Sequence, residues 1–417
     1  MHDSISRRTF IRSTAAATLV GSAAMKSAGQ SDQRLRIGLV GVGRRGHELL
    51  RLFRSIEQAK IVAICDDYRP HLDNARQTVS RGYKPYQNFK GMMTNETLDA
   101  VVIATPPEHH HAMCTTAVKR GLGVFCETPM GLTIDEARDL VGQVETNKTI
   151  FQLGLQRRSN AVYEQAEAMV RTGLLGDITA VKCQWHLNND ERRPVPVSKG
   201  HPDFARLDRK LNWQFYRSAT PGLVAEYGSH QLDAVNRLLG VAPTRVIGMG
   251  GVDYWQDGRE TYDNVFCTYE YHVPGKSESR SRIVRATFSA IQTNAHEGVS
   301  ELMMGTKGTL LLSPKMGLYY REHVGGASRE VDGVSGATVR TPGSPWAHRG
   351  KSTEITSVAD DTRASLVSFV DAVNAGDRDT VCDARIGLEN TATTLIANEA
   401  IETGRPVEFP DDCRQGG

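Results

Sequence analysis

The sequence lacks the features that mark several large classes of protein. No apolar stretch reaches the roughly 20 residues that a membrane-spanning helix needs, so we expect no membrane span. The formal net charge is only +2, from 50 basic and 48 acidic residues. This balance gives no reason to expect nucleic acid or an anionic membrane as the main partner. No composition bias indicates a fibrous or disordered chain, and a length of 417 residues suggests two or three domains.

Cysteine and histidine are present without a recognisable metal or redox motif. The seven cysteines include no C-x-x-C pair, and an odd count at scattered spacings does not suggest a disulfide framework. Four of them lie in or beside apolar, strand-like segments, where cysteine usually behaves as a small buried hydrophobe: Cys65, Cys126, Cys183 and Cys267. His109, His110 and His111 are consecutive, and consecutive residues of a helix do not face one point. We therefore predict no metal site.

Residues 1–30 predict an export signal. Arg7 and Arg8 form an arginine pair, and a weakly apolar run from Ser13 to Ala24 follows them. Paired arginines before a short apolar region are typical of the twin-arginine export route. The alternative is a basic tail with a chance arginine pair. We expect a signal peptide and a periplasmic protein.

Apolar strand patterns alternate with helical patterns over residues 34–155. The predicted strands are Leu35–Val40, Ile61–Cys65, Asp99–Thr105, Val124–Glu127 and Ile150–Leu155. The predicted helices between them are Arg45–Ile56, Glu108–Arg120 and Ile134–Glu145. Continuous apolar strands with intervening helices predict a parallel sheet covered on both faces. We therefore predict a Rossmann-type, doubly wound α/β domain.

Residues 156–410 have a different pattern and predict a second α/β domain. Its β-like runs have few helices between them, which favours a large open, mostly antiparallel sheet: Ile178–Leu187, Arg245–Gly250, Asn264–Tyr271, Arg282–Ala290 and Thr309–Leu312. The predicted helices are Ala161–Thr172, Arg363–Ala375 and Ile386–Thr403. Gly325–Ser352 is rich in small residues and predicts a long surface loop. The open sheet is the expected self-association surface, so we expect a homo-oligomer.

A glycine turn follows the first predicted strand and opens the first predicted helix. Gly41, Gly43 and Gly46 form a G-x-G-x-x-G motif. The first glycine permits a tight turn, the second lets a pyrophosphate approach the backbone, and the third lets helix and strand pack closely. Backbone N–H groups at the helix N-terminus then meet the phosphate charge. The motif predicts a dinucleotide site; the alternative is a tight turn without a ligand.

Asp66 supports this site and bears on the choice of cofactor. It ends the second predicted strand, where a carboxylate accepts hydrogen bonds from the ribose hydroxyls. A carboxylate there repels a 2′-phosphate, so NAD is expected over NADP, although Arg44 could reach such a phosphate. Thr105 and Pro106 follow the third predicted strand, at the carboxyl edge where a cofactor would lie. The full predicted cofactor set is Gly41, Val42, Gly43, Arg44, Arg45, Gly46, Asp66, Thr105, Pro106, Glu127 and Thr128.

Several short segments together resemble the Gfo/Idh/MocA family (glucose–fructose oxidoreductase / inositol dehydrogenase). They are Gly38–Gly43, Ala104–Pro107, Cys126–Met130, Glu226–Asp233 and Gly305–Thr309. The resemblance covers nearly all of the chain after the predicted signal. It implies a Rossmann domain followed by an α/β domain with an open sheet. It also implies NAD(P)-linked oxidation or reduction of a sugar or polyol.

The sequence departs from the family pattern at two positions. The family's E-K-P motif places a catalytic lysine near the nicotinamide, whereas this chain has Glu127, Thr128 and Pro129. The family also commonly has D-x-G-x-H, whereas here Glu226 replaces the aspartate and His230 is retained. An imidazole with an unperturbed pKa near ~6.5 suits proton transfer, so we predict His230 as the general base and Glu226 as its orienting partner. The alternative is a helix-capping pair beside the site.

Further candidates lie near these segments. Lys210 is the nearest predicted substitute for the missing lysine. The predicted substrate-binding residues are Arg157, His186, Trp213 and Tyr216. The alternative for each is an ordinary solvated charge or a packing aromatic ring.

The predicted export constrains the reaction. A periplasm-like space is expected to hold little free NAD(H), so we expect a tightly held nucleotide that is recycled in place. One sugar position would be oxidised and a second substrate, or the same molecule, would then be reduced. A second hypothesis is a redox-neutral NAD-dependent glycosidase or lyase that acts through a transient keto-sugar. A third is a ligand-binding protein that has lost catalysis.

Overall fold

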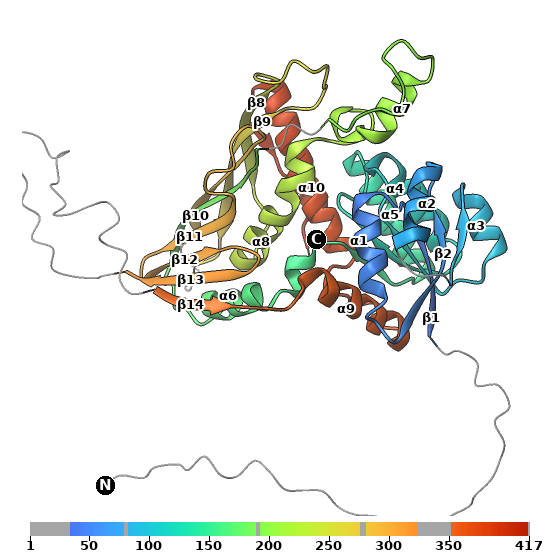
Figure 1. Cartoon of the computed structure of the whole chain (residues 1–417). Helices are drawn as coiled ribbons and strands as arrows, with labels where there is room; N and C mark the ends of the chain where they lie inside the picture. The colour runs from blue at the N-terminus through green and yellow to red at the C-terminus, as the bar shows by residue number, and fades with distance from the viewer. Residues whose placement is uncertain (1–33, 79–81, 189–191, 276–280, 323–351, 416–417) are drawn as a thin grey trace, which may run out of the picture. The chain divides into compact units, whose positions relative to one another are not determined.

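The computed structural model describes residues 34–78, 82–188, 192–275, 281–322 and 352–415. Two β-sheets, of six and nine strands, organise these residues (Figure 1). The predicted export signal lies outside the described residues. So does the predicted loop at 325–352, except for Ser352, which begins a strand.

The first sheet is parallel throughout, with the strand order β3-β2-β1-β4-β5-β6. Its strands are β1 Leu35–Val40, β2 Ala59–Cys65, β3 Lys84–Tyr86, β4 Ala100–Ile103, β5 Gly123–Cys126 and β6 Phe151–Leu153. The predicted doubly wound parallel sheet is confirmed. Every residue of β4 and β5 is buried, because helices cover both faces of such a sheet. The order reverses between β1 and β4, and ligands of this architecture bind outside the carboxyl ends of the strands at that point.

The helices of this half connect the parallel strands. They are α1 Arg44–Phe53, α2 Arg69–Thr78, α3 Phe89–Asn95, α4 His110–Val118 and α5 Ile134–Asn147. A later helix, α9 Asp361–Ala375, also packs on this sheet. Its Phe369 ring lies 5.7 Å from the Phe125 ring of β5, and Val373 packs against Gly123. The chain therefore returns to its first sheet near its end.

The second sheet has the strand order β14-β13-β12-β11-β7-β10-β9-β8-β15. Its strands are β7 Ile178–His186, β8 Arg245–Gly251, β9 Asn264–Val273, β10 Arg282–Ile291, β11 Val299–Gly305, β12 Gly308–Leu312, β13 Met316–Arg321, β14 Ser352–Thr356 and β15 Val407–Glu408. Among these described strands, only β7 and β10 pair in parallel. The predicted, mostly antiparallel sheet is confirmed.

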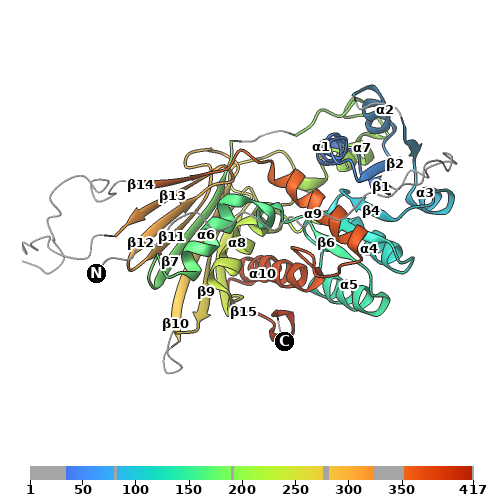
Figure 2. The same cartoon turned by 90° about the horizontal axis from the view of Figure 1, so that it is seen from below.

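One face of the second sheet is covered by helices, as Figure 2 shows. These helices are α6 Ala161–Arg171, α8 Ser229–Leu239 and α10 Ala384–Thr403. Buried aromatic side chains such as Tyr269, Tyr271 and Phe288 fill the core beneath them. Alternate residues of a strand point to opposite faces, which explains the alternating burial of β9 and β10.

Two irregular segments lie between β7 and α8. The short helix α7, Phe204–Leu211, comes first. A π-helical turn, Val224–Gly228, then leads directly into α8. Such turns are rare and often occur at functional sites. No helix in the described ranges combines the length and apolar character that crossing a bilayer would require.

Candidate functional site

The glycine turn between β1 and α1 has the geometry of a dinucleotide cradle. Gly41 has φ +82°, and a Cβ on it would lie 2.5 Å from the carbonyl oxygen of Ala104. A Cβ on Gly46 would lie 1.7 Å from the carbonyl oxygen of Gly41. A Cβ on Gly43 would meet, among the described residues, just the ring of His71 at 3.5 Å. Packing therefore requires two of the glycines, and the third keeps the turn open for a ligand.

Asp66 lies directly beside this turn at the end of β2. Its carboxylate accepts hydrogen bonds from the backbone N–H groups of Val42, at 2.9 Å, and Tyr68, at 2.8 Å. The ring Nδ1 of His71 lies 3.2 Å from the same carboxylate. Asp66 thus fixes the glycine turn and places a negative charge next to it, as a ribose site requires. His71 was missed in the sequence because α2 has only two buried positions to mark it.

These residues fit the family's dinucleotide. The turn leads backbone N–H groups into the N-terminus of α1, where a phosphate is stabilised. Arg44 and Arg45 add positive charge to the first turn of that helix. Arg44 is exposed, whereas Arg45 donates from Nε to Glu127 at 2.9 Å and from Nη1 to Glu48 at 2.9 Å. The glycine turn and the segment after β5 are therefore joined by an ion pair.

His110 connects two further loops of the predicted cofactor set. Its Nε2 lies 2.8 Å from the carbonyl oxygen of Thr105, and its Nδ1 lies 2.7 Å from that of Pro129. The ring is buried, and burial lowers its pKa, although the two carbonyl contacts oppose this lowering. The ring spans the loop with Thr105 and Pro106 and the loop with Thr128, and so fixes one against the other.

Glu226 lies in the π-helical turn. Its Oε1 accepts a hydrogen bond from the hydroxyl of Thr220 at 2.5 Å. Burial raises the pKa of Glu226 to about 7; the Thr220 hydrogen bond opposes this rise, and the negative charge of Glu127 adds to it. Burial also raises the pKa of Glu127, although Arg45 opposes that rise. The charge of Glu127 thus acts on Glu226, and Thr128 brings no lysine charge beside Glu127.

His230 follows one turn later, on α8. Burial, and then the positive charges of Arg157 and Arg45, lower the pKa of His230 to about 3. Its ring centroid lies 5.9 Å from that of Trp185, and Trp185 stacks on Tyr227 at 5.1 Å. The sequence-based prediction assumed an ordinary imidazole pKa, and the role of His230 as general base stays a prediction.

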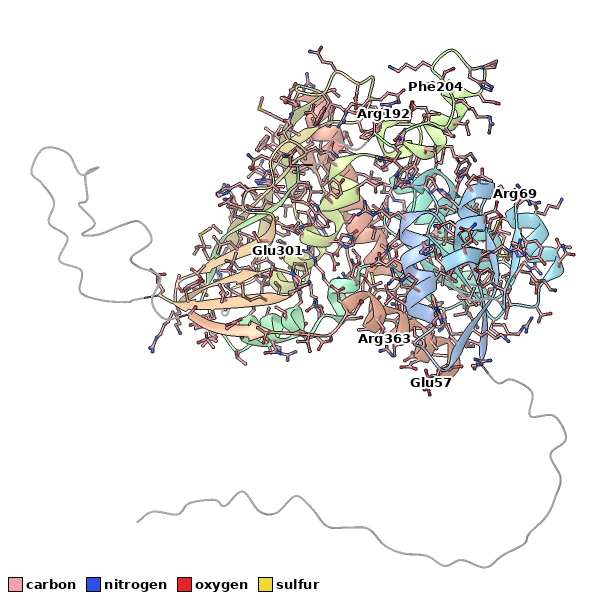
Figure 3. All side chains as sticks on the ribbon, in the orientation of Figure 1. Glu57, Arg69, Arg192, Phe204, Glu301 and Arg363 are labelled. Carbon is pink, nitrogen blue, oxygen red and sulfur yellow. The ribbon has the colours of Figure 1, made fainter. Side chains whose placement is uncertain are left out.

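Arg157 is buried beside Trp185 and pairs with an acidic residue of the second sheet. Its side chain is 4% exposed and forms an ion pair with Glu301 of β11, which is labelled in Figure 3. Glu301 also accepts a hydrogen bond from the Tyr163 hydroxyl at 2.7 Å. The guanidinium lies 5.9 Å from the centre of the Trp185 ring. Because Arg157 is buried and paired, it orients Trp185 and influences His230, and it is not exposed to contact a substrate.

Two of the other predicted substrate residues, His186 and Tyr216, have partners within the protein. His186 uses both ring nitrogens, with His296 O at 3.1 Å and Ser289 Oγ at 2.9 Å. It points to the opposite face of β7 from Trp185, because neighbouring strand residues alternate.

Lys210 lies in α7, and Trp213 and Tyr216 follow it. Tyr216 donates its hydroxyl hydrogen to Asp208, and Trp213 is half-buried in the short 3-10 helix Trp213–Phe215. Lys210 pairs with Asp67. It therefore lies beside Asp66, and nothing in this contact supports its predicted role as a substitute for the missing lysine.

Two family models match the chain. One, described as an oxidoreductase family with an NAD-binding Rossmann fold, matches residues 35–155. The other, described as the C-terminal alpha/beta domain of the same oxidoreductase family, matches residues 167–409. The chain belongs to the Gfo/Idh/MocA oxidoreductase family. The first domain of this family member is thus an NAD-binding domain, and the resemblance inferred from the short motifs is confirmed.

Individual relatives are similar to part of the chain. A "Glycosyl hydrolase family 109 protein" from Shewanella amazonensis is 32% identical over 261 residues, which cover 54% of this chain and 55% of that protein. The "Rhizopine catabolism protein MocA" of Rhizobium meliloti is 30% identical, over 51% of this chain and 59% of that protein. The alignments thus span a little over half of each of these relatives.

A solved structure shares the fold over most of the chain. The WlbA dehydrogenase from Bordetella pertussis, in complex with NADH and UDP-GlcNAcA, has a TM-score of 0.66 and 18% sequence identity. The match covers 90% of this chain and 99% of that one.

Proposed function

We propose that this family member is an NAD(P)-dependent oxidoreductase that acts on a CH–OH group of a sugar or polyol and recycles a tightly bound nucleotide. The observation that carries the proposal is the joining of the glycine turn to the Glu226–His230 segment. Arg45, from the turn, pairs with Glu127, and Arg45 and Glu127 influence the pKa values of His230 and Glu226. We infer from these interactions that a cofactor cradle and a proton-transfer group share one site.

Each residue has a defined role in this proposal. When bound, a nicotinamide dinucleotide supplies hydride acceptance at the CH–OH carbon, and hydride return in the reverse direction. The glycine turn and Asp66 hold the nucleotide. Glu226 takes the hydroxyl proton in oxidation and gives it back in reduction, because its pKa of about 7 makes both forms available at neutral pH. His230 stays neutral and orients the substrate by hydrogen bonding.

The first experiment asks whether nucleotide stays bound. Full-length protein is expressed in the cytoplasm, purified without added nucleotide and denatured, and the released nucleotide is identified by absorbance and mass. We expect NAD(H) near one per chain. Sugars and polyols are then added to the folded protein, and a change in absorbance of bound nucleotide without free NAD supports a closed cycle. Protein purified without nucleotide contradicts the resident-cofactor proposal.

Site variants test the assigned roles. Glu226→Gln should abolish turnover and leave the nucleotide content unchanged, whereas His230→Ala should weaken it and keep the pH dependence of the wild type. Undiminished turnover by Glu226→Gln overturns its role as the proton acceptor. Binding of a sugar without any redox change in the wild type would support the third hypothesis, a ligand-binding protein.

A second candidate function is a redox-neutral NAD-dependent glycosidase or lyase. It is favoured by Thr128 in place of the family lysine and by the 32% identity to a glycosyl hydrolase family 109 protein. In such a reaction, transient oxidation of one sugar carbon acidifies the neighbouring C–H bond. Loss of that proton expels the glycosidic oxygen, which is protonated and leaves as an alcohol, and forms a C=C bond. A glycosidase then adds water to this bond, whereas a lyase keeps it, and the hydride held by the nucleotide reduces the carbonyl. Aryl-glycoside release without any added acceptor distinguishes this reaction from net dehydrogenation.

We also propose that the protein is exported by the twin-arginine route to the periplasm. The support is the arginine pair and the short apolar run in residues 1–30. In a bacterial host with that route, full-length protein should be found in the periplasmic fraction. An Arg7→Lys, Arg8→Lys variant should stay in the cytoplasm, and periplasmic recovery of that variant would contradict the route.

The open face of the second sheet is the proposed self-association surface. Four large apolar side chains on β8, β9 and β10 are exposed, at 47% for Ile247, 77% for Met249, 54% for Phe266 and 50% for Ile283. Met249 pairs directly with Phe266 across the strands, so they share a face. Ile247, Met249 and Phe266 are neighbours on that face, whereas Ile283 lies further along it, opposite His272. Neighbouring exposed apolar side chains often mark an interface. Wild-type protein should be oligomeric in light scattering, and Met249→Lys with Phe266→Lys should be monomeric.

A further inference from the structure

The short helix α7 belongs to the second half of the chain but contacts the nucleotide-binding half. Arg209 Nη2 lies 2.6 Å from Glu108 Oε2. The next residue, Lys210, pairs with Asp67. Close by, the backbone N–H of Glu108 donates to the carbonyl oxygen of Ala219 at 3.1 Å. In Figures 1 and 2, α7 lies beside the first sheet's helices, on the side of α2.

The two acidic partners lie on either side of the glycine turn. Asp67 follows β2 and Glu108 follows β4, whereas Gly41 to Gly46 follow β1. In the sheet, β1 lies between β2 and β4, and the carboxyl ends of parallel strands meet at one edge. A helix that holds Asp67 with one residue and Glu108 with the next therefore crosses the edge at the dinucleotide cradle.

A buried network anchors α7 to the second half of the chain. Asp208, which is 4% exposed, pairs with Arg192 and accepts from the Tyr216 hydroxyl and from Asn212 Nδ2, the last at 2.8 Å. The Arg192 guanidinium in turn lies 5.5 Å from the centre of the Phe215 ring. Figure 3 labels Arg192 and Phe204, which begin this region. Asp208 thus holds α7 to the second half of the chain, while Arg209 and Lys210 of the same helix pair with acidic residues of the nucleotide-binding half.

We propose that α7 is a clasp that retains the nicotinamide dinucleotide, with Arg209 and Lys210 as the residues that close it. This inference rests on the proposed resident nucleotide and gives its structural cause. A nucleotide in the cradle is enclosed between the glycine turn and α7, and it leaves when both ion pairs open. The ion pairs are between side chains that solvent can reach, so salt screens them, and release of the nucleotide accelerates as salt rises.

The test measures nucleotide release. Protein loaded with NADH is mixed with excess NAD⁺, and the loss of bound-NADH fluorescence gives the release rate. Arg209→Gln with Lys210→Gln should release NADH about 10-fold faster, since two solvent-reachable ion pairs are lost, and its rate should depend less on salt. Arg206→Gln is the matched control, because Arg206 pairs within the same segment, with Asp203 at 3.1 Å. This control should release NADH at the wild-type rate.

Several outcomes decide the matter. Release from the double variant within twofold of the wild type overturns the clasp, as does equal acceleration by Arg206→Gln. The variant Lys210→Asp with Asp67→Lys exchanges the two charges of one pair, and slow NADH release from this variant supports the clasp. Faster release of NADPH but not of NADH from Lys210→Gln would instead make Lys210 a direct phosphate contact. If wild-type protein is purified empty but loaded NADH is still held by the two pairs, only the resident-cofactor proposal fails.

Discussion

Replacing Glu226 by glutamine tests the electrostatics of the site without knowledge of the substrate. Burial and the charge of Glu127 raise the pKa of Glu226 from 4.5 to about 7, against the opposing effect of Thr220. Glutamine has nearly the same shape and cannot ionise. The variant therefore removes one titration and keeps the packing of the π-helical turn.

The magnitude and sign follow from the two pKa values. Below pH 4.5 the carboxyl group is protonated in both the folded and the unfolded chain, so its ionisation contributes nothing. Between pH 4.5 and 7 the unfolded chain loses this proton while the folded protein keeps it, which costs the folded state about 1.4 kcal/mol per pH unit. Above pH 7 the folded state has lost a constant amount of stability, about 3 kcal/mol. The Glu226→Gln variant does not lose this stability, because its side chain does not ionise.

The assay is the unfolding transition of both proteins from pH 4 to 8 at equal nucleotide content. The variant's free energy of unfolding should rise relative to the wild type across pH 4.5 to 7 and then level off. Glu57→Gln is the control, because Glu57 is exposed, and its difference from the wild type should change little over this window. A difference that stays constant with pH for Glu226→Gln would refute the raised pKa, and with it the proposed role of this carboxyl group.

Two further predictions concern packing. Gly46→Ala should lower the free energy of unfolding by about 3 kcal/mol and abolish nucleotide binding, because the new Cβ would lie 1.7 Å from the Gly41 carbonyl oxygen. Gly43→Ala should fold normally, as measured by circular dichroism, and lose only the nucleotide, as measured by the absorbance of bound nucleotide. Glu301→Gln should lower the free energy of unfolding by about 3–5 kcal/mol in urea, since it leaves the buried Arg157 charge without its counter-ion. The double variant Glu301→Leu with Arg157→Met should be more stable than Glu301→Gln, and the opposite order would contradict the buried-pair argument.

The parts of the fold that the sequence predicts are those whose burial creates a pattern along the chain. The strands β4 and β5 are buried at every residue, so they appear as unbroken apolar runs. In contrast, β3 has only three residues, two of them exposed, and the α2 helix buries only Leu72 and Ala75. Neither leaves a pattern to detect. The return of α9 to the first sheet depends on contacts with residues far away in the sequence, which no local pattern reports.

The candidate site divides in the same way. The glycine turn and Asp66 are local features, and their residue types could be predicted together with their positions. The pKa of His230 could not, because it depends on burial and on the charges of Arg157 and Arg45, which come from distant segments. Lys210 was predicted near the reacting groups because it precedes the Glu226 segment in the sequence. Its partner in the structure, Asp67, is 143 residues away along the chain.

The missing family lysine changes how the proposed cycle handles protons. Arg45 supplies a cation to Glu127 from the cofactor side, but no ammonium group stands at position 128 to favour ionisation of Glu226. Burial, and then the charge of Glu127, raise the pKa of the Glu226 carboxyl group to about 7, against the effect of the Thr220 hydrogen bond. A closed cycle needs a base when the alcohol is oxidised and an acid when the carbonyl is reduced, and one group can serve both steps only if its pKa lies near the working pH. Thr128 leaves this raised pKa without a neighbouring ammonium charge to lower it. In the proposed cycle this favours a site that alternates between the two half-reactions over one tuned to a single direction.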